Sequence, residues 1–168
     1  GVFYPDYFGK NFVLNDLTHE GGLTAIRIEG PTNSVEQRLD RLSKELGLLE
    51  QELSILDNEQ SNIFWGRTKN LEVFKSLESN LLRIVVPISE TLQVIQKFKN
   101  YEIKYFIDWG GSLIWCSFDQ LNTKILNEIK DIVKKHQGYV TLIKVEEDLK
   151  ASADIFTIDP IKYKISEK

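Results

Sequence analysis

The stretch Leu81-Leu82-Arg83-Ile84-Val85-Val86-Pro87 opens the part of the sequence that decides the fold class. Its aliphatic and β-branched residues predict a strand, and Pro87 ends that strand because proline has no N–H to donate to a sheet. A helix capped by Ser89 follows, with apolar residues at helical spacing up to residue 98. Strands are then predicted at residues 101–108, 113–118 and 139–145, with a long helix between the last two.

The order of these elements is strand, helix, strand, strand, helix, strand, which is the split βαβ or ferredoxin-like pattern. Toward the N-terminus the sequence signals are weaker. They predict strands at residues 11–15 and 23–29 and a short helix at 58–65. Ser34 and Gln37 have the spacing of a capping box for a further helix, which Gly47 ends in the left-handed conformation. We interpret this part as a partial second copy. The expected fold class is α+β, an antiparallel sheet with helices on one face, made of two ferredoxin-like (split βαβ) halves.

We expect a single domain over residues 1–168, with the first, partial half at 1–79 and the second half at 80–145. Residues 146–168 are predicted to form an irregular tail and a truncated helix. The sequence contains no methionine and begins inside an apolar run at Gly1-Val2-Phe3-Tyr4. This start predicts a domain taken from a larger protein, with Gly1 left over from a tag.

The composition excludes several classes of protein. Hydrophobic residues make up 42% and charged residues 27%, which is typical of a globular chain, and the net charge of −4 disfavours a nucleic-acid binder. A single cysteine and two histidines cannot build an internal disulfide or a histidine-rich metal site. No apolar run is long enough to span a bilayer and no signal peptide opens the chain, so a soluble, cytoplasmic protein without a membrane span is expected.

Chemical motifs are few. The sequence has no Gly-x-Gly-x-x-Gly or Walker pattern, so no standard phosphate loop is predicted. His19 reads as part of a surface loop, His136 as a helix end, and Cys116 as a small, packed hydrophobe. We therefore predict no catalytic residue and no metal ligand in this chain.

Two arginines, Arg27 and Arg83, interrupt apolar strands. If the helices cover one face of the sheet, these side chains lie on the other face, together with Asp108 or Trp115. Two interpretations stay open: a solvated face with scattered or ion-paired charges, or a ligand-facing sheet on which arginines hold an anion among aromatic residues. Trp65 poses the same choice between packing and lining a site.

The sharpest local signal is Ile107-Asp108-Trp109-Gly110-Gly111. The two glycines permit positive φ or a close backbone approach, and the aspartate can accept hydrogen bonds from turn amides. A hairpin turn explains the glycines, but it does not explain a tryptophan at the tip.

With its following strand and long helix, Asp108-Trp109-Gly110-Gly111 resembles the FAD-binding accessory subunit of bacterial glycolate oxidase. That family belongs to the FAD-linked oxidases of the vanillyl-alcohol-oxidase type. Further matches occur in the same order, spanning nearly the whole chain: Ile26-Arg27-Ile28-Glu29-Gly30, Phe64-Trp65, and Leu81-Leu82-Arg83-Ile84 with Pro87. Only Asp-Trp-Gly-Gly is individually specific.

The sequence departs from the family at three places. Leu82 stands where the family usually has tryptophan, and Gln137-Gly138-Tyr139-Val140-Thr141 lacks a histidine that often follows the long helix, so no role is transferred to it. The family's closing Phe-Asp-Pro and Asn-Pro-Gly segment would begin just after Lys168.

The resemblance implies that the chain is the C-terminal, substrate-side cap of such a flavoprotein and is inactive alone. The FAD would be held mainly by an N-terminal domain, and the open sheet face would help to form a pocket for a small 2-hydroxy acid. Further partners implied are a second flavoprotein subunit and an iron–sulfur subunit, through which the protein would lie in the cytoplasm or at the inner membrane. The substrate- or flavin-facing candidates are Arg27, Trp65, Arg83, Asp108, Trp109, Gly110, Gly111 and Trp115.

Two other functions fit the order of elements. One is a stand-alone ferredoxin-like module that binds a small ligand or mediates oligomerisation without enzymatic activity. The other is RNA recognition on the sheet, which the acidic net charge and the lack of basic-aromatic strands disfavour.

Overall fold

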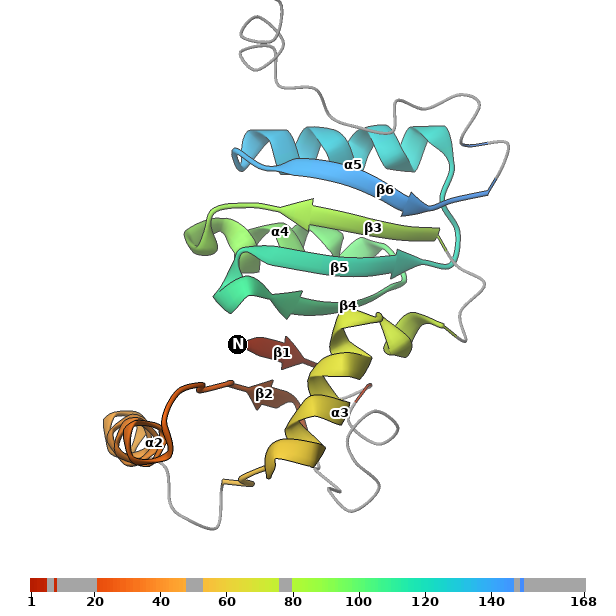
Figure 1. Ribbon diagram of the computed structural model, residues 1–168. Helices are drawn as coiled ribbons and strands as arrows, with labels where there is room; N and C mark the ends of the chain where they lie inside the picture. Colours follow the sequence, from red (N-terminus) through yellow and green to blue (C-terminus); the bar gives the residue numbers. More distant parts are fainter. Residues whose placement is uncertain (6–7, 9–20, 48–52, 76–79, 147–148, 150–168) are drawn as a thin grey trace, which may run out of the picture.

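The fold is seen in a computed structural model that describes residues 1–5, 8, 21–47, 53–75, 80–146 and 149 (Figure 1). The predicted strand at 11–15, His19 and the predicted helix at 161–168 lie outside these residues. The described residues form an α+β fold around one antiparallel sheet of six strands in the order β2-β1-β4-β5-β3-β6. The strands are β1 (Val2–Tyr4), β2 (Leu23–Ala25), β3 (Asn80–Val85), β4 (Ile103–Asp108), β5 (Leu113–Phe118) and β6 (Tyr139–Lys144).

Helices cover both faces of this sheet, so the expectation of helices on one face was wrong. Helices α4 (Thr91–Lys97) and α5 (Thr123–Lys135) lie behind the sheet in Figure 1, and α3 (Asn58–Lys69) lies in front of it. Side chains alternate between the faces of a strand, so each sheet residue belongs to one of two separate cores. Leu82 and Ile84 pack with α4 and α5, whereas Leu81 packs with α3.

The two cores differ in composition. Behind the sheet, aliphatic residues predominate, as the apolar stripe of α5 at Leu126, Ile129 and Val133 illustrates. In front of it, α3 and the 3-10 turn η2 (Glu72–Phe74) bring aromatic rings onto the sheet, where Phe74 stacks on Phe106 at 5.7 Å between ring centroids. The front core is therefore smaller but more aromatic.

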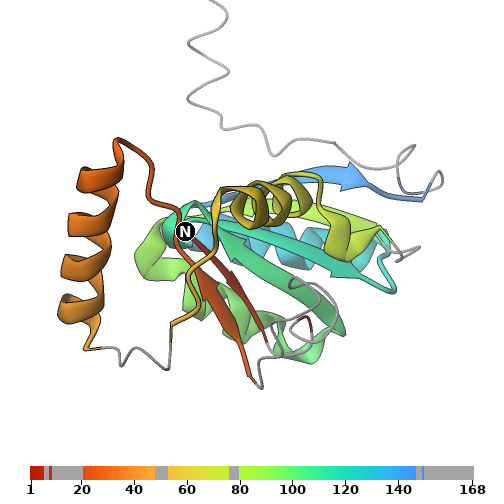
Figure 2. The same cartoon turned by 60° about the horizontal axis from the view of Figure 1, so that its bottom comes forward.

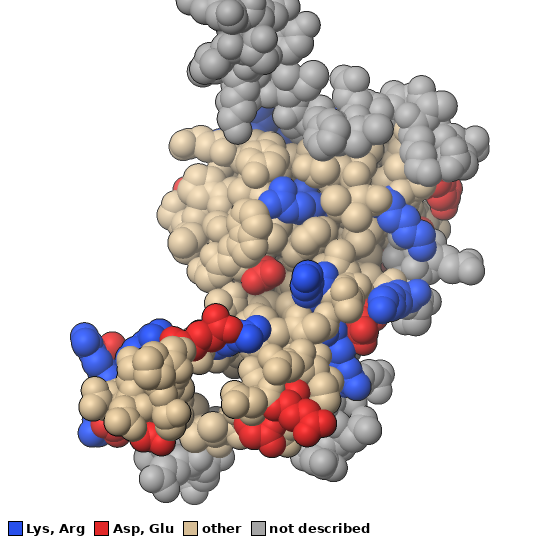
Figure 3. All heavy atoms as spheres, viewed as in Figure 1, with Lys and Arg blue, Asp and Glu red and all other residues tan. Residues whose placement is uncertain are grey.

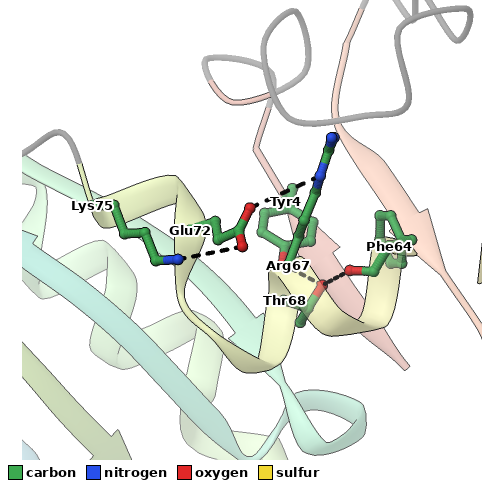
Figure 4. A network of polar contacts seen from close by, with 6 residues as sticks. All are labelled: Tyr4, Phe64, Arg67, Thr68, Glu72 and Lys75. Atoms are coloured by element: carbon green, nitrogen blue, oxygen red, sulfur yellow. Dashed lines mark hydrogen bonds and ion pairs between the residues drawn. The ribbon is translucent and has the colours of Figure 1, made fainter. Parts of the chain in front are cut away.

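A polar network fastens α3 to the edge of the sheet (Figure 4). The Tyr4 hydroxyl of β1 donates to the Thr68 hydroxyl at 2.9 Å, and Thr68 in turn donates to the carbonyl of Phe64 at 3.1 Å. At the surface, Glu72 pairs with Arg67 at 3.9 Å and with Lys75 at 3.3 Å. The buried Tyr4–Thr68 bond fixes the position of α3 along the sheet.

Helix α2 (Thr32–Leu46) stands beside the sheet and not on it (Figures 1 and 2). None of its side chains is buried by the described part of the chain, although Val35, Leu39, Leu42 and Leu46 form an apolar stripe. Gly47 ends the helix with φ 63°, as predicted, but the predicted Ser34 cap is wrong because the helix begins earlier, after Pro31.

Other element ends moved for local reasons. Of the strand predicted at 23–29, only β2 (Leu23–Ala25) is hydrogen-bonded in the sheet, because residues 26–30 turn away toward α2. Helix α3 runs four residues beyond the expected end at Trp65, and it begins with a capping box between Asp57 and Gln60. Ser89 caps no helix, since it lies inside a 3-10 turn, Ile88–Glu90 (η3).

The chain order of the second half, β3-α4-β4-β5-α5-β6, is the one expected, and α4 and α5 lie on the same face. The described residues of the first half supply β1 and β2, two neighbouring strands at one side of the sheet, followed by two helices, an order that does not repeat the second half. The two ferredoxin-like halves remain an interpretation of the sequence.

Candidate functional site

The turn between β4 and β5 is built from an unusual backbone. Trp109, Gly110 and Gly111 form a 3-10 turn (η5) and all have positive φ, at 51°, 64° and 118°. The Asp108 carboxylate accepts the N–H of Trp109 at 2.6 Å, and the Ser112 hydroxyl donates to the carbonyl of Trp109 at 3.3 Å. Glycine adopts this conformation freely, but an L-residue such as tryptophan pays about 1–2 kcal/mol for it.

Further contacts hold the turn from both sides. The Gly110 N–H donates to the carbonyl of Gly1 at 3.1 Å, and the buried Thr91 hydroxyl at the start of α4 donates to the carbonyl of Gly111. A Cβ atom on Gly111 would lie 3.3 Å from Ile88 Cγ2. The surrounding structure therefore imposes the conformation that Trp109 adopts.

The consequence is a tryptophan presented at the surface with a cation on its face. The Trp109 side chain is 57% exposed, and the Arg83 guanidinium lies 4.8 Å from the centroid of its ring. Arg83 comes from the middle of β3, next to Trp115 of β5. Among the described residues, no ion pair includes the Arg83 guanidinium, so its side-chain N–H groups are available to an anion.

A pocket of about 340 Å³ opens beside this pair, between α3 and the front of the sheet. The sheet side and the turn supply Asp108, Trp109, Leu113 and Trp115. The α3 side supplies Trp65, Thr68, Lys69 and Leu71. Three tryptophans, one carboxylate and one ammonium group therefore meet in one cavity, with the Arg83 guanidinium next to it.

Few charged side chains line the pocket, and these are Asp108 and Lys69. Lys69 is exposed, and among the described residues no ion pair includes Asp108 or Lys69. Figure 3 shows that charged side chains gather mainly over α2 and α3, and that fewer lie over the upper part of the sheet. The charged groups at the pocket thus keep their capacity for a ligand.

Tyr4 lies under the α3 side of this site. Burial raises its pKa above the usual range, the hydrogen bond with Thr68 lowers it, and the negative charge of Asp108 raises it further. Tyr4 is therefore a neutral hydroxyl that positions Thr68 in the pocket wall, and it has no role as a base.

The structure brings most of the predicted site residues together. Trp65, Asp108, Trp109 and Trp115 line the pocket, Arg83 stacks on Trp109, and Gly110 and Gly111 shape the turn. Arg27 is elsewhere: it follows the edge strand β2 and pairs with Glu29 at 2.6 Å. Arg27 is thus ion-paired at the surface, whereas Arg83 lies on Trp109, next to the pocket.

On the α3 side of the pocket, sequence reasoning found Trp65 and missed the other residues. Thr68 and Lys69 line the pocket because α3 extends beyond the predicted end, and Leu71 follows in the turn after it. The basic Arg67 and Lys69, which are favourable in the last turn of a helix, were the signal for a longer helix. Leu113 was expected in a strand, but only its register opposite Asp108 shows that it faces this cavity.

Other reactive groups have structural explanations. Cys116 is fully buried, and burial raises the pKa of its thiol, so it is not a nucleophile. His136 Nδ1 lies 2.6 Å from Glu90 Oε2, which joins the end of α5 to the turn before α4. Across the part of the chain that the structure describes, no group of three or more metal-ligating side chains occurs, and no helix has the length and apolar character to cross a bilayer.

Comparisons with known proteins add no relative to this picture. Neither the models of protein families nor the curated proteins contain a match to the chain.

Proposed function

We propose that this chain is the substrate-side cap domain of an FAD-linked oxidoreductase subunit that resembles glycolate oxidase, and that its pocket binds a small 2-hydroxy acid. The observation that carries the proposal is the strained Asp108-Trp109-Gly110-Gly111 turn, which places Trp109 in the pocket lining and against the Arg83 guanidinium of β3. A strained, exposed aromatic residue has a cost in folding free energy, and such costs are concentrated at functional sites.

The groups at the pocket match the groups of a 2-hydroxy acid. The Arg83 guanidinium can hold the carboxylate through paired N–H···O bonds, with Lys69 as a second positive charge at the lining. The Asp108 carboxylate can accept the proton-bearing 2-hydroxyl, because its only described bond so far is with the Trp109 amide. Bound in this way, the acid is oriented by two opposite charges on one face of the sheet.

FAD itself does not fit the described residues. A cavity of about 340 Å³ is at the small end of ligand pockets and cannot hold a dinucleotide. The sequence also lacks a Gly-x-Gly-x-x-Gly phosphate loop. In this proposal the flavin belongs to an N-terminal domain and supplies the redox chemistry there, while this chain binds and orients the acid and excludes water from it.

The first test is calorimetric titration of the chain with 2-hydroxy acids. Arg83→Ala should weaken binding about tenfold to a hundredfold, because a hydrogen bond between charged groups contributes roughly 1.5–3 kcal/mol. Arg27→Ala is the matched control, since that arginine is paired with Glu29 outside the pocket, and it should bind like the unaltered chain. Equal losses in both variants would contradict the proposal.

The second test concerns the flavin. The chain alone should bind FAD weakly or not at all, and the full-length product of the native reading frame should be yellow with bound flavin. In that protein Arg83→Ala should lower turnover or the assembly of the complex. A colourless full-length protein would refute the flavoprotein assignment.

A second candidate function, self-association, is supported by α2. Its four-residue apolar stripe remains uncovered by the described residues, and isolated helices of about 15 residues are marginal in water. Sedimentation of the chain should then show a dimer that Leu42→Glu dissociates and that Lys44→Glu, on the polar side, leaves intact. A monomer at all concentrations would exclude this role.

A further inference from the structure

The pocket beside α3 is larger than a two-carbon acid needs. Its volume of about 340 Å³ lies within the range of roughly 300–1,000 Å³ found for pockets that hold drug-sized ligands. Glycolate bound between Arg83 and Asp108 would fill a small part of this space and leave the rest to water. The unused volume is therefore the first indication of what the ligand carries besides its polar end.

Apart from Thr68 and Lys69 on the side of α3, the lining is apolar on both sides of that space. Trp65 and Leu71 line it from the side of α3, and Leu113 and Trp115 line it from the sheet. Trp115 is stacked on Phe106 with 6.5 Å between ring centroids, and Trp65 packs edge-on against Phe64 at 5.2 Å. Both indoles are thus held in place by rings of the front core, which makes them a preformed surface for an aromatic or branched aliphatic group.

Few charged groups lie in or beside the pocket, one negative and two positive. The lining contains one carboxylate, Asp108, and one ammonium group, Lys69, and the Arg83 guanidinium stands beside Trp109. A ligand with one carboxylate satisfies this arrangement. A second carboxylate placed against Trp65, Leu71 and Leu113 would lose its hydration there.

We infer that the ligand of this pocket is a 2-hydroxy acid with an apolar side chain, aryl or branched alkyl, and not glycolate. The inference rests on the proposed function. The carboxylate pairs with Arg83, the 2-hydroxyl donates to Asp108, and the side chain packs between Trp65 and Trp115.

The test is titration calorimetry on the unaltered 168-residue chain with 3-phenyllactate, glycolate and phenylalanine. Phenyllactate should bind about tenfold to a hundredfold more tightly than glycolate, as expected for burial of an aromatic side chain. If glycolate binds as tightly as phenyllactate, the inference is overturned and the proposed function stands. If neither hydroxy acid binds, the proposed function fails as well.

Phenylalanine serves as the control for the hydroxyl group. It has the same carboxylate and ring as phenyllactate, with an ammonium group in place of the hydroxyl. Tighter binding of phenylalanine would assign the site to amino acids and overturn the assignment to hydroxy acids.

A variant locates the side-chain pocket. Trp65→Leu should lower the affinity for phenyllactate about tenfold and leave that for glycolate unchanged, because glycolate does not reach this wall. Ile143→Ala, which removes an exposed apolar side chain of β6 outside the lining, should change neither affinity. An equal loss for both acids in Trp65→Leu would contradict the inference. The comparison of ligands on the unaltered chain remains decisive if this variant folds poorly.

Discussion

At the scale of single residues, Trp109 has a conformation that its own chemistry disfavours. A left-handed backbone costs an L-residue about 1–2 kcal/mol, and the exposed ring recovers part of this through the Arg83 guanidinium, a contact of about 0.5–1 kcal/mol at exposed sites. On this balance the contact with Arg83 does not fully offset the cost of the backbone, so Trp109 adds little to the stability of the fold.

Replacement of Trp109 by glycine separates these two roles. Trp109→Gly relieves the backbone and loses the ring, so we expect the free energy of unfolding to change by less than about 1 kcal/mol. Binding of 2-hydroxy acids should nevertheless fall. Urea denaturation and calorimetry measure the two quantities, and a large loss of stability would show that the ring is structural.

Two further glycines, Gly138 and Gly66, differ in the space around them. A Cβ atom on Gly138 would come 2.5 Å from the carbonyl oxygen of Val85 and would also clash with Val86. The left-handed residue at this helix end is Gln137, with φ 58°, so Gly138 is needed for close packing and not for the cap. Gly66 in α3 has no atom within 4 Å of an added Cβ.

These environments predict opposite signs for the same substitution. Gly138→Ala should lower the free energy of unfolding by about 1–3 kcal/mol, because a backbone carbonyl cannot move aside easily. Gly66→Ala should raise it by roughly 0.5–1 kcal/mol, the gain of alanine over glycine inside a helix. Thermal and urea unfolding measure both changes in the free energy of unfolding. If Gly138→Ala raised it as Gly66→Ala does, the packing at Gly138 would be loose and the prediction wrong.

At the scale of elements, the relation between α4 and α5 depends on a contact between their ends. The half-buried His136 at the end of α5 approaches Glu90 in the turn before α4, at 2.6 Å. This contact spans 46 residues of sequence and lies at the same end of the sheet as the Trp109 turn. The contact therefore joins α4 and α5, the two helices behind the sheet, at the end of the sheet where the Trp109 turn lies.

A double-mutant cycle measures this tie. His136→Ala, Glu90→Ala and the double variant should give a coupling of about 0.5–1.5 kcal/mol in the free energy of unfolding. The exposed pair Lys44 and Asp40 on α2, at 2.7 Å, is the matched control and should couple by less than about 0.5 kcal/mol. Equal coupling energies in both cycles would mean that burial does not strengthen the His136–Glu90 contact.

Elements also show where sequence patterns were sufficient. The strand at 113–118, the helix ended by Gly47 and the turn at Gly110-Gly111 were all predicted from local signals. The extension of α3 to Lys69 and the shortness of β2 were not, because pairing partners and packing surfaces elsewhere in the chain decide them.

At the scale of the whole molecule, two buried acids make the fold sensitive to alkali. Burial raises the pKa of Tyr4 and of the Cys116 thiol above their ordinary values of 10.0 and 9.0. Both groups are neutral when protonated, so the folded state holds the proton more tightly than the unfolded state. Their contribution to stability is present below the ordinary pKa values and is lost as the pH rises above them.

Stability should therefore be constant with respect to these groups up to about pH 9 and fall at higher pH. Tyr4→Phe should make that fall less steep, whereas Tyr139→Phe, at an exposed tyrosine, should leave it unchanged. Urea denaturation between neutral and alkaline pH measures this. The same slope in Tyr4→Phe and in the unaltered chain would show that Tyr4 does not contribute.

The sequence by itself determined the α+β class, the order of elements from β3 to β6 and the residue types of the site, because periodicity, turn chemistry and caps act over a few neighbouring residues. Only the tertiary structure decided that helices cover both faces of the sheet and that Arg83, unlike Arg27, lies against the pocket. These outcomes depend on the register of Arg83 beside Trp115 and on the buried bond between Tyr4 and Thr68. Contacts between residues so far apart in sequence leave no local pattern, and they form only when burial brings the elements together.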